Sequence, residues 1–301
     1  MPPEKPPSNP NDPRAVPESQ CFGGAFIRGY RRVRQVASGT RADIFLAERI
    51  DTRSLVALKV VRDEPEQGEA ADGAAPAPDA FARFLQEYEI AQRIRHPGIV
   101  RLFDLGVSDE HAWLVMEYFP RGDLRRRMKS PIAPRWAVRV SAAIARALHA
   151  LHTGGVVHRD LKPGNIMLRE DRSIALIDFG LSKDAAQRLD LTECGLIFGT
   201  PHYMSPEQGH GEAIDARSDL YSLGVILYEM LTGSKPYRAE TPMALIYKHR
   251  KEPVPQLAAA LDGLQPLLER LLAKRPEDRF SSALAAAEAL ERQLERFLEP
   301  A

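Results

Sequence analysis

The pattern of apolar residues changes at Pro120, and this change restricts the fold more than any other feature of the chain. Before Pro120, short segments alternate between apolar and polar residues or are rich in β-branched residues, which predicts strands joined by short turns. The expected strands are 31–38, 44–50, 54–61, 100–105 and 112–118. The first part of the chain is therefore expected to form a small sheet.

Helical spacing dominates after Pro120. Apolar residues from Trp136 to Leu151 line one face, and the segment 220–231 is apolar nearly all round, as in a helix buried inside a domain. A last helix is expected from a Ser281 or Ser282 cap to about Leu298. One amphipathic helix, marked by Phe81, Phe84, Leu85 and Tyr88, falls among the strands. We therefore predict an α+β fold in which a small β-rich lobe with one helix precedes a larger, mainly helical lobe, with a ligand cleft between the two.

The segment before the expected domain and one internal loop differ in composition from the rest. Seven prolines between residues 2 and 17 predict an unfolded leader over 1–27. Residues 63–79 hold six acidic residues and no basic one, which predicts a flexible acidic loop. The folded domain is expected at 28–298, with its lobes at 28–119 and 120–298.

Charge and cysteine content exclude several classes of partner. Lys plus Arg equal Asp plus Glu at 41 each, so no global field attracts the chain to nucleic acid, and no nucleic-acid partner is expected. The longest apolar run is shorter than the roughly 20 residues of a membrane span. Cys21 and Cys194 lie far apart, so no disulfide framework is expected and a reducing cytoplasm is the predicted location.

The segment His158–Asn165 combines three reactive side chains in one loop. Asp160 can orient and deprotonate a hydroxyl, and Lys162 can clamp a phosphate. Asn165 and Asp178, thirteen residues later at the end of an expected strand, supply hard oxygen ligands suited to Mg2+. The pattern predicts phosphate chemistry assisted by a metal ion.

This segment, followed by Asp178-Phe179-Gly180, resembles the catalytic loop and metal-binding motif of bacterial eukaryotic-like (Hanks-type) serine/threonine protein kinases. The resemblance covers about 28–298 and implies a bilobal kinase fold. It implies transfer of the ATP γ-phosphoryl group to serine or threonine hydroxyls of protein substrates, with Mg2+ or Mn2+ as the metal. A homodimer is expected by resemblance alone.

The other parts of the kinase pattern follow in order. Val56-Ala57-Leu58-Lys59 matches the strand whose lysine holds the α and β phosphates, and we expect Glu87, rather than Glu89, to be its partner. Further residues are expected by resemblance to surround the nucleotide, although ordinary core packing is the alternative for each apolar one. They are Val36, Ile44, Ala57 and Met167 around adenine, Met116 as gatekeeper, the Glu117 carbonyl and the Phe119 amide at the hinge, and Asp123 at the ribose.

The glycine-rich loop of the family is degraded here. Ala37 and Ala42 stand at the first and third glycine positions, and only Gly39 is kept. Glycine there lets backbone amides approach phosphates closely. We expect weaker ATP binding or slow catalysis, and an ATP-binding scaffold without strong activity, resembling a pseudokinase, is the alternative hypothesis.

The segment Gly199–Glu207 resembles the substrate-docking loop of serine/threonine kinases. By the same resemblance Glu207 is expected to pair with Arg279, and Asp219 to cap the catalytic loop. Arg159 beside Asp160 suggests control by phosphorylation of the activation segment, which lies between Asp178 and Glu207. Thr192 is the predicted regulatory phosphosite, modified by autophosphorylation, ahead of Ser182 and Thr200.

Overall fold

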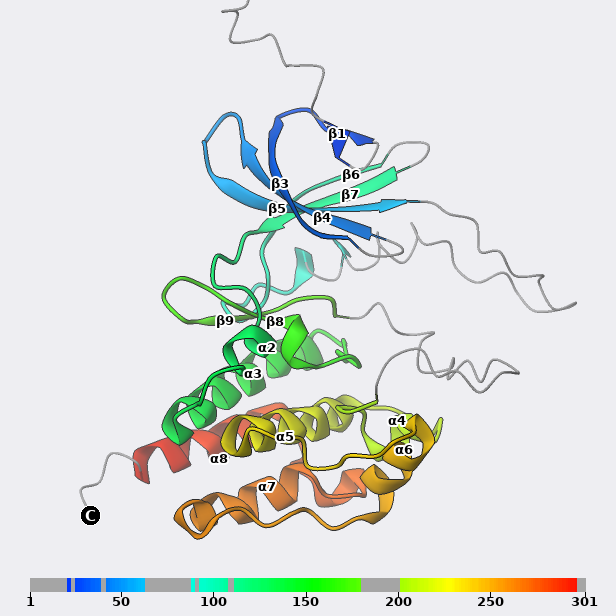
Figure 1. The fold of residues 1–301 in the computed structure, drawn as a ribbon, viewed down its shortest axis with the longest axis vertical. Helices are drawn as coiled ribbons and strands as arrows, with labels where there is room; N and C mark the ends of the chain where they lie inside the picture. The colour runs from blue at the N-terminus through cyan, green and yellow to red at the C-terminus, as the bar shows by residue number, and fades with distance from the viewer. Residues whose placement is uncertain are drawn as a thin grey trace, which may run out of the picture. The chain divides into compact units, whose positions relative to one another are not determined.

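A computed structural model of the chain was analysed (Figure 1). It describes residues 21–22, 25–38, 42–62, 88–89, 92–107, 111–179 and 201–296. The chain divides into two compact units: Met1–Ala77 with Phe103–Tyr118, and Pro78–Leu102 with Phe119–Ala301.

The first unit is built on a five-stranded sheet whose strands follow the order β3-β4-β5-β7-β6 (Figure 1). β4 pairs with β3 and β5, and β5 pairs with β7, all antiparallel. Each strand lies within a few residues of an expected one. The strands are β3 (Tyr30–Ser38), β4 (Ala42–Arg49), β5 (Leu55–Arg62), β6 (Leu102–Val107) and β7 (His111–Glu117).

One face of this sheet carries the core of the first unit. Phe45, Leu58 and Val115 are buried there together with Phe22, which comes from the short hairpin β1 (Cys21–Phe22) and β2 (Ala25–Phe26). The Phe22 ring is fully buried and meets the Phe45 ring edge-on, with 5.5 Å between centroids. The domain boundary between residues 27 and 28 stays a prediction. Phe22 and Ile27, which precede this boundary, are buried in the core of the first unit.

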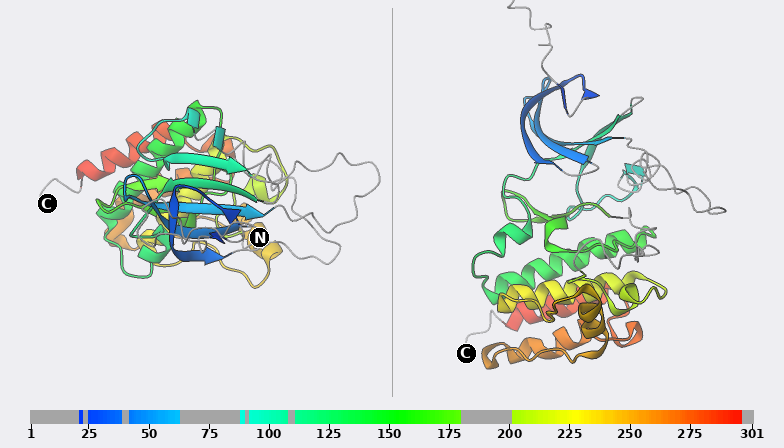
Figure 2. Two further views of the ribbon diagram at one scale, coloured as in Figure 1. Left: turned by 90° about the horizontal axis from the view of Figure 1, so that it is seen from above. Right: turned by 45° about the vertical axis from the view of Figure 1, so that its right-hand side comes forward.

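Long helices dominate the second unit. α3 (Pro134–Thr153) packs against both α5 (Ala216–Thr232) and α8 (Ala283–Arg296), and the three lie side by side in Figure 2. Twelve of the seventeen residues of α5 are buried, as its apolar sequence predicts. The Arg146 guanidinium binds the Glu291 carboxylate through hydrogen bonds of 3.0 and 2.6 Å, which ties α3 to α8.

Shorter elements complete the second unit. Among the residues that the structure describes, four are α-helices, three are 3-10 helices and two strands form a hairpin. They are α2 (Leu124–Arg127), α4 (Pro206–Gly209), α6 (Pro242–Lys251), α7 (Gln265–Leu271), η1 (Pro163–Asn165), η2 (Ala259–Leu264), η3 (Pro276–Asp278), β8 (Ile166–Leu168) and β9 (Ile174–Leu176). A β-sheet unit and a mainly helical unit agree with the predicted α+β class.

The ends of two expected helices can be compared with the structure. Ser282 precedes α8 and its Oγ accepts a hydrogen bond from the Ala285 N–H at 3.1 Å, so the cap lies at the second of the two expected serines. Residues 81–87 of the helix expected among the strands lie outside the described residues, whereas 88–89 and 92–93 are helical.

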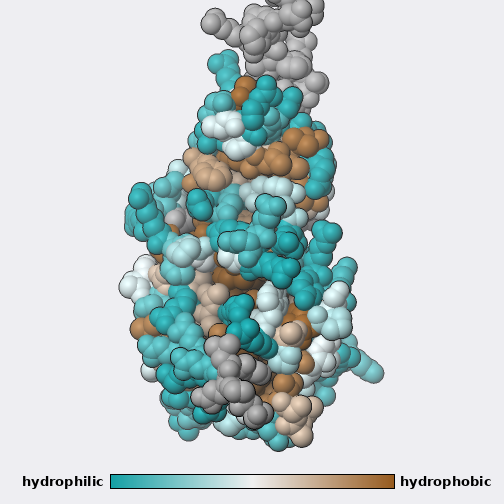
Figure 3. All heavy atoms as spheres, turned by 90° about the vertical axis from the view of Figure 1, so that its left-hand side faces the viewer, coloured by the Kyte–Doolittle hydropathy of each residue, from teal (hydrophilic) through white to brown (hydrophobic). Residues whose placement is uncertain are grey.

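The face drawn in Figure 3 is mostly hydrophilic. The large exposed apolar side chains lie mainly in the first unit, where they are Val33, Val36, Ile50, Leu55, Phe103 and Val107. Among the described residues, no helix combines the length and the apolar character needed to cross a membrane.

Candidate active site

The loop between α3 and β8 brings three of the predicted residues together. Lys162 Nζ donates to Asp160 Oδ2 at 2.6 Å, and Asn165 Nδ2 donates to the Asp160 carbonyl at 2.9 Å and to Oδ2 at 3.1 Å. About half of the Asp160 side chain is exposed. Because both donors use Oδ2, the other carboxylate oxygen has no donor among the described residues and can accept a proton or a hydroxyl hydrogen.

The buried carboxylate of Asp219, in the first turn of α5, holds the start of this loop. It accepts hydrogen bonds from the His158 N–H and the Arg159 N–H, both at 2.9 Å. His152 Nε2 at the end of α3 lies 2.7 Å from Asp219 Oδ2. The structure therefore shows the cap predicted for Asp219 and adds His152, a contact that no local sequence pattern marks.

The β8–β9 hairpin places Asn165 near Asp178. Ile166 pairs with Leu176, and the Ile177 N–H donates to the Asn165 carbonyl at 3.0 Å, one residue before Asp178. Asp178 has a φ of 55°, in the left-handed region that non-glycine residues rarely adopt. Such strained backbone concentrates at functional sites, where the surrounding structure enforces it.

The donor set of Asn165 and Asp178 fits a divalent metal ion. The Asn165 amide nitrogen is committed to Asp160, which leaves its Oδ1 as a ligand atom beside the Asp178 carboxylate. No group of three His, Cys, Asp or Glu that could hold a metal occurs in the described part of the chain. An Mg2+ ion fits this arrangement, because it commonly takes one or two protein oxygens and completes its shell with waters and phosphates.

The first unit presents four of the predicted residues on one face of its sheet. In the register of the strands Ile44 faces Lys59, and Ala57 faces Met116. Residues directly opposite in antiparallel strands share a face. That face is opposite the one that holds Phe45 and Leu58, because side chains alternate along each strand. Lys59 is thus on the face free of the main core.

The degraded glycine-rich loop is braced at its base. Ala37 pairs with Ile44 and Ala42 pairs with Val61, so both alanines belong to strands. Asp43, which follows Ala42 and pairs with Ser38, is only 3% exposed. Its Oδ1 accepts hydrogen bonds from Ser38 Oγ at 2.6 Å and from Gln35 Nε2 at 3.1 Å. Side-chain hydrogen bonds therefore connect the two strands where the family has glycines.

Three predicted nucleotide residues lie in the second unit. Asp123 and Met167 face each other in an isolated β-bridge, and Phe119 is buried. Asp123 caps α2, because its Oδ1 accepts the Arg126 N–H at 2.7 Å and its Oδ2 accepts from Arg125 at 3.2 Å. Asp123 therefore has a structural role besides the predicted ribose contact.

The remaining predicted residues lie on strands of the first unit or outside the described residues. Val36 is 46% exposed on β3, and Glu117 ends β7. Gly39, Glu87 and Thr192 lie outside the described residues.

Residues 201–209, called the docking segment here, are anchored by a buried ion pair. Arg279 Nη1 and Nη2 donate to Glu207 Oε1 and Oε2, each at 2.7 Å, and both side chains are at most 3% exposed. Ser218 Oγ on α5 adds a 2.6 Å hydrogen bond to Glu207 Oε1. Burial alone would raise the pKa of Glu207, but the guanidinium outweighs it and lowers the pKa, so the carboxylate is charged.

Ser205 and Gln208 form a contact that the sequence analysis missed. Each bonds to the backbone of the other, as a capping box for α4, and Gln208 Nε2 also donates to the Arg159 carbonyl at 2.7 Å. Gln208 thus links the docking segment to the residue before Asp160. The spacing Ser-Pro-Glu-Gln is a capping-box pattern and could have revealed the cap, but not the link.

Comparison with known proteins gives one family model, described as protein kinase domain, which matches residues 30–294. Three curated relatives are bacterial. The chain is 34% identical over 256 residues to "Serine/threonine-protein kinase PknB" of Mycobacterium leprae (strain TN), covering 81% of the chain and 40% of the relative. It is 35% identical over 290 residues to "Serine/threonine-protein kinase Pkn1" of Myxococcus xanthus, covering 93% and 40%. It is 36% identical over 270 residues to "Probable serine/threonine-protein kinase pknA2" of Bifidobacterium longum (strain NCC 2705), covering 87% and 34%. The chain therefore spans less than half the length of these relatives.

Proposed function

Because the chain belongs to the protein kinase family, among bacterial relatives of the Hanks type, we propose that it transfers the γ-phosphoryl group of ATP to serine or threonine hydroxyls of proteins. The observation that supports this best is the cluster of Asp160, Lys162 and Asn165, joined by hydrogen bonds of 2.6 to 3.1 Å.

Each side chain of the cluster has a distinct proposed role. Asp160 accepts the proton of the attacking hydroxyl, for which its Oδ1 is open. Lys162, already within hydrogen-bond distance of Asp160, supplies positive charge to the transferred phosphoryl group. Asn165 holds the Asp160 backbone and carboxylate in place, which fixes the base for attack.

Asn165 and Asp178 would hold the divalent metal ion, Mg2+ or Mn2+. When bound, the ion neutralises charge on the phosphate oxygens of ATP. Lys59 is proposed to bind the α and β phosphates, with Glu87 as its partner. The half-buried residues Ile44, Ala57 and Met116, which share one face of the sheet, support an adenine site in the first unit.

Other parts of the proposal follow from the resemblance alone. They are adenine contacts of Val36, Phe119 and Met167, hinge contacts at Glu117, a ribose contact at Asp123 and autophosphorylation at Thr192. A homodimer and a cytoplasmic location, where ATP is supplied, remain predictions. The degraded glycine-rich loop is the motive for the scaffold alternative, but such a scaffold is expected to have lost Lys59, Asp160 or Asp178, and all three are present.

Phosphosite mapping after incubation with Mg-ATP tests the proposal. The purified chain is incubated with a protein substrate mixture beside the Asp160→Asn variant, and both are checked for equal folding by thermal unfolding. We expect phosphoserine and phosphothreonine with the unchanged chain and almost none with the variant. Equal incorporation in both, or none in either, contradicts the proposal.

A further inference from the structure

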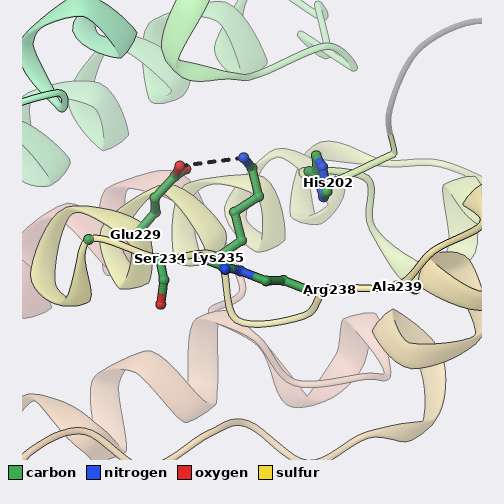
Figure 4. Close-up of a pocket in the computed structure, with 7 residues that line it drawn as sticks. His202, Glu229, Ser234, Lys235, Arg238 and Ala239 are labelled. Atoms are coloured by element: carbon green, nitrogen blue, oxygen red, sulfur yellow. Dashed lines mark ion pairs between the residues drawn. The ribbon is translucent and has the colours of Figure 1, made fainter.

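A cavity of about 410 Å³ lies in the second unit, beside the docking segment (Figure 4). Its walls come from the docking segment, the last turn of α5 and the loop that follows α5. The lining residues are His202, Glu229, Gly233, Ser234, Lys235, Arg238 and Ala239. None of them belongs to the catalytic cluster.

The one acidic side chain among these lining residues is already engaged. Glu229 Oε2 accepts a 2.6 Å hydrogen bond from the Tyr203 hydroxyl, and Oε1 lies 3.6 Å from Lys235 Nζ. Figure 4 shows the Lys235 ammonium group extended toward the Glu229 carboxylate. A positively charged ligand would therefore have to displace Lys235 and would approach Arg238 as well.

The basic side chains of the cavity keep unused hydrogen-bond donors. Lys235 Nζ forms an ion pair with Glu229 Oε1 at 3.6 Å and lies 5.7 Å from the centre of the Tyr203 ring, but its N–H groups make no hydrogen bond to an acceptor within the described residues. Arg238 is exposed and has no acidic partner there. His202 Nδ1 is buried without a hydrogen-bond partner. Burial, and then the charge of Lys235, lower the pKa of His202, which favours its neutral ring. Lys235 and Arg238 therefore supply the positive charge of the cavity.

The docking segment connects this cavity to the catalytic loop. Tyr203, next to His202, is held by Ser222 Oγ of α5, which donates to its carbonyl at 2.7 Å. Five residues later Gln208 donates to the Arg159 carbonyl, beside Asp160. The docking segment therefore runs from the cavity, at His202, to Gln208, which contacts the catalytic loop.

We propose that this cavity binds an anionic side chain of the protein substrate, either a phosphorylated serine or threonine or an aspartate or glutamate. The inference rests on the proposed kinase activity and specifies its substrate class. Oxygen atoms of a phosphate or carboxylate accept charge-assisted hydrogen bonds from Lys235 and Arg238, which are stronger than bonds between neutral groups. The Glu229 carboxylate offsets only one of the two positive charges, so Lys235 and Arg238 together leave the cavity with an excess of positive charge.

Peptides that differ in one residue test the proposal. A threonine peptide carries phosphoserine, aspartate, serine or lysine at each flanking position in turn. Phosphotransfer is measured as kcat/KM, and binding without ATP is measured by fluorescence anisotropy. At one flanking position we expect about tenfold higher kcat/KM and tighter binding for an anionic residue than for serine, and lower values for lysine.

Variants assign this preference to the cavity. The double variant Lys235→Gln/Arg238→Gln should lose the preference for an anionic flanking residue. It should still phosphorylate the threonine peptide with a flanking serine at an unchanged rate. The control Arg292→Gln alters an exposed arginine on α8 and should keep the preference. Lys235→Glu/Arg238→Glu should favour the lysine peptide instead.

The outcomes separate the two proposals. No phosphotransfer to any peptide contradicts the kinase activity, whereas equal phosphotransfer to anionic and neutral peptides overturns the anion site alone. A preference that survives in Lys235→Gln/Arg238→Gln also overturns it. A gain for phosphoserine far above aspartate assigns a phosphorylated residue, and equal gains assign acidic residues in general.

Discussion

Arg279 reaches Glu207 across 72 residues of sequence and binds it through two 2.7 Å hydrogen bonds inside the second unit. The guanidinium also donates to the carbonyls of Ala273 and Arg217, at 2.9 Å each. One side chain thereby joins the docking segment, the start of α5 and the loop before η3.

Arg279→Met should therefore destabilise the fold by about 3–5 kcal/mol, because it leaves the Glu207 carboxylate buried without its partner. Chemical denaturation measures the change. The double variant Glu207→Gln/Arg279→Met removes both charges and should be less destabilised than Arg279→Met alone. If the double variant is the less stable of the two, the ion pair does not act as described.

Stability should fall as pH decreases from about 6.5 toward 3, in part because of His249. Burial, and then the charge of Lys274, lower the pKa of this histidine from 6.5 to about 3. Between these values the unfolded chain takes up a proton that the folded chain does not, so acid favours unfolding. His249→Asn should weaken the difference in Tm between pH 7 and pH 5. His210→Asn, at an exposed site, should leave that difference unchanged.

Gln208→Met should lower kcat strongly while lowering the free energy of unfolding only a little. The variant loses the hydrogen bond to the Arg159 carbonyl, which positions the loop that carries Asp160, as well as the capping box. Ser205→Ala loses the cap, at a cost of about 1 kcal/mol, but keeps the bond to Arg159. Steady-state kinetics on folded protein separate the two effects. An equal fall of kcat in both variants would show that only the cap matters.

Phe22→Ala should destabilise the first unit by about 3–5 kcal/mol, since it removes a fully buried ring that packs on Phe45. Phe103→Ala is the matched control, because that ring is 44% exposed. Its effect should stay within about 0.5 kcal/mol. Thermal and urea unfolding of the two variants give the comparison, and a Phe22→Ala chain as stable as the control would contradict the packing.

Ala37→Gly/Ala42→Gly should lower the apparent KM for ATP. Both alanines sit in paired strands beside the buried Asp43, so the backbone there is stiffer than a glycine-rich one. ATP titrations at saturating peptide measure the change, and the KM for peptide serves as the internal control. An unchanged KM for ATP would show that the hydrogen bonds of Asp43 already place the loop correctly.

The positions of most strands and helices could be predicted because burial on one face leaves a periodic pattern. The segments at β3, β4 and β5, and the continuous apolar run of α5, are examples. The candidate active-site residues Asp160, Lys162 and Asn165 were predictable because they fall within eight consecutive residues. A local pattern therefore sufficed for the cluster.

Contacts between distant segments were not predictable in this way. Phe22 stands beside two glycines after a proline-rich stretch, so no periodicity marks it as core. Gln208 and His152 owe their roles to partners 49 and 67 residues away. The cavity beside Tyr203 likewise combines residues from 202 to 239 that share no motif.

The first turns of α5 hold two loops at once. Asp219 binds the catalytic loop, while Ser218 and Ser222 bind the docking segment. Genetic screens should therefore recover few alleles in this stretch that separate catalysis from substrate choice, because a substitution in these turns disturbs both the catalytic loop and the docking segment. Compensating changes would have to arise on the same helix, which makes these few positions hard to alter one at a time during divergence.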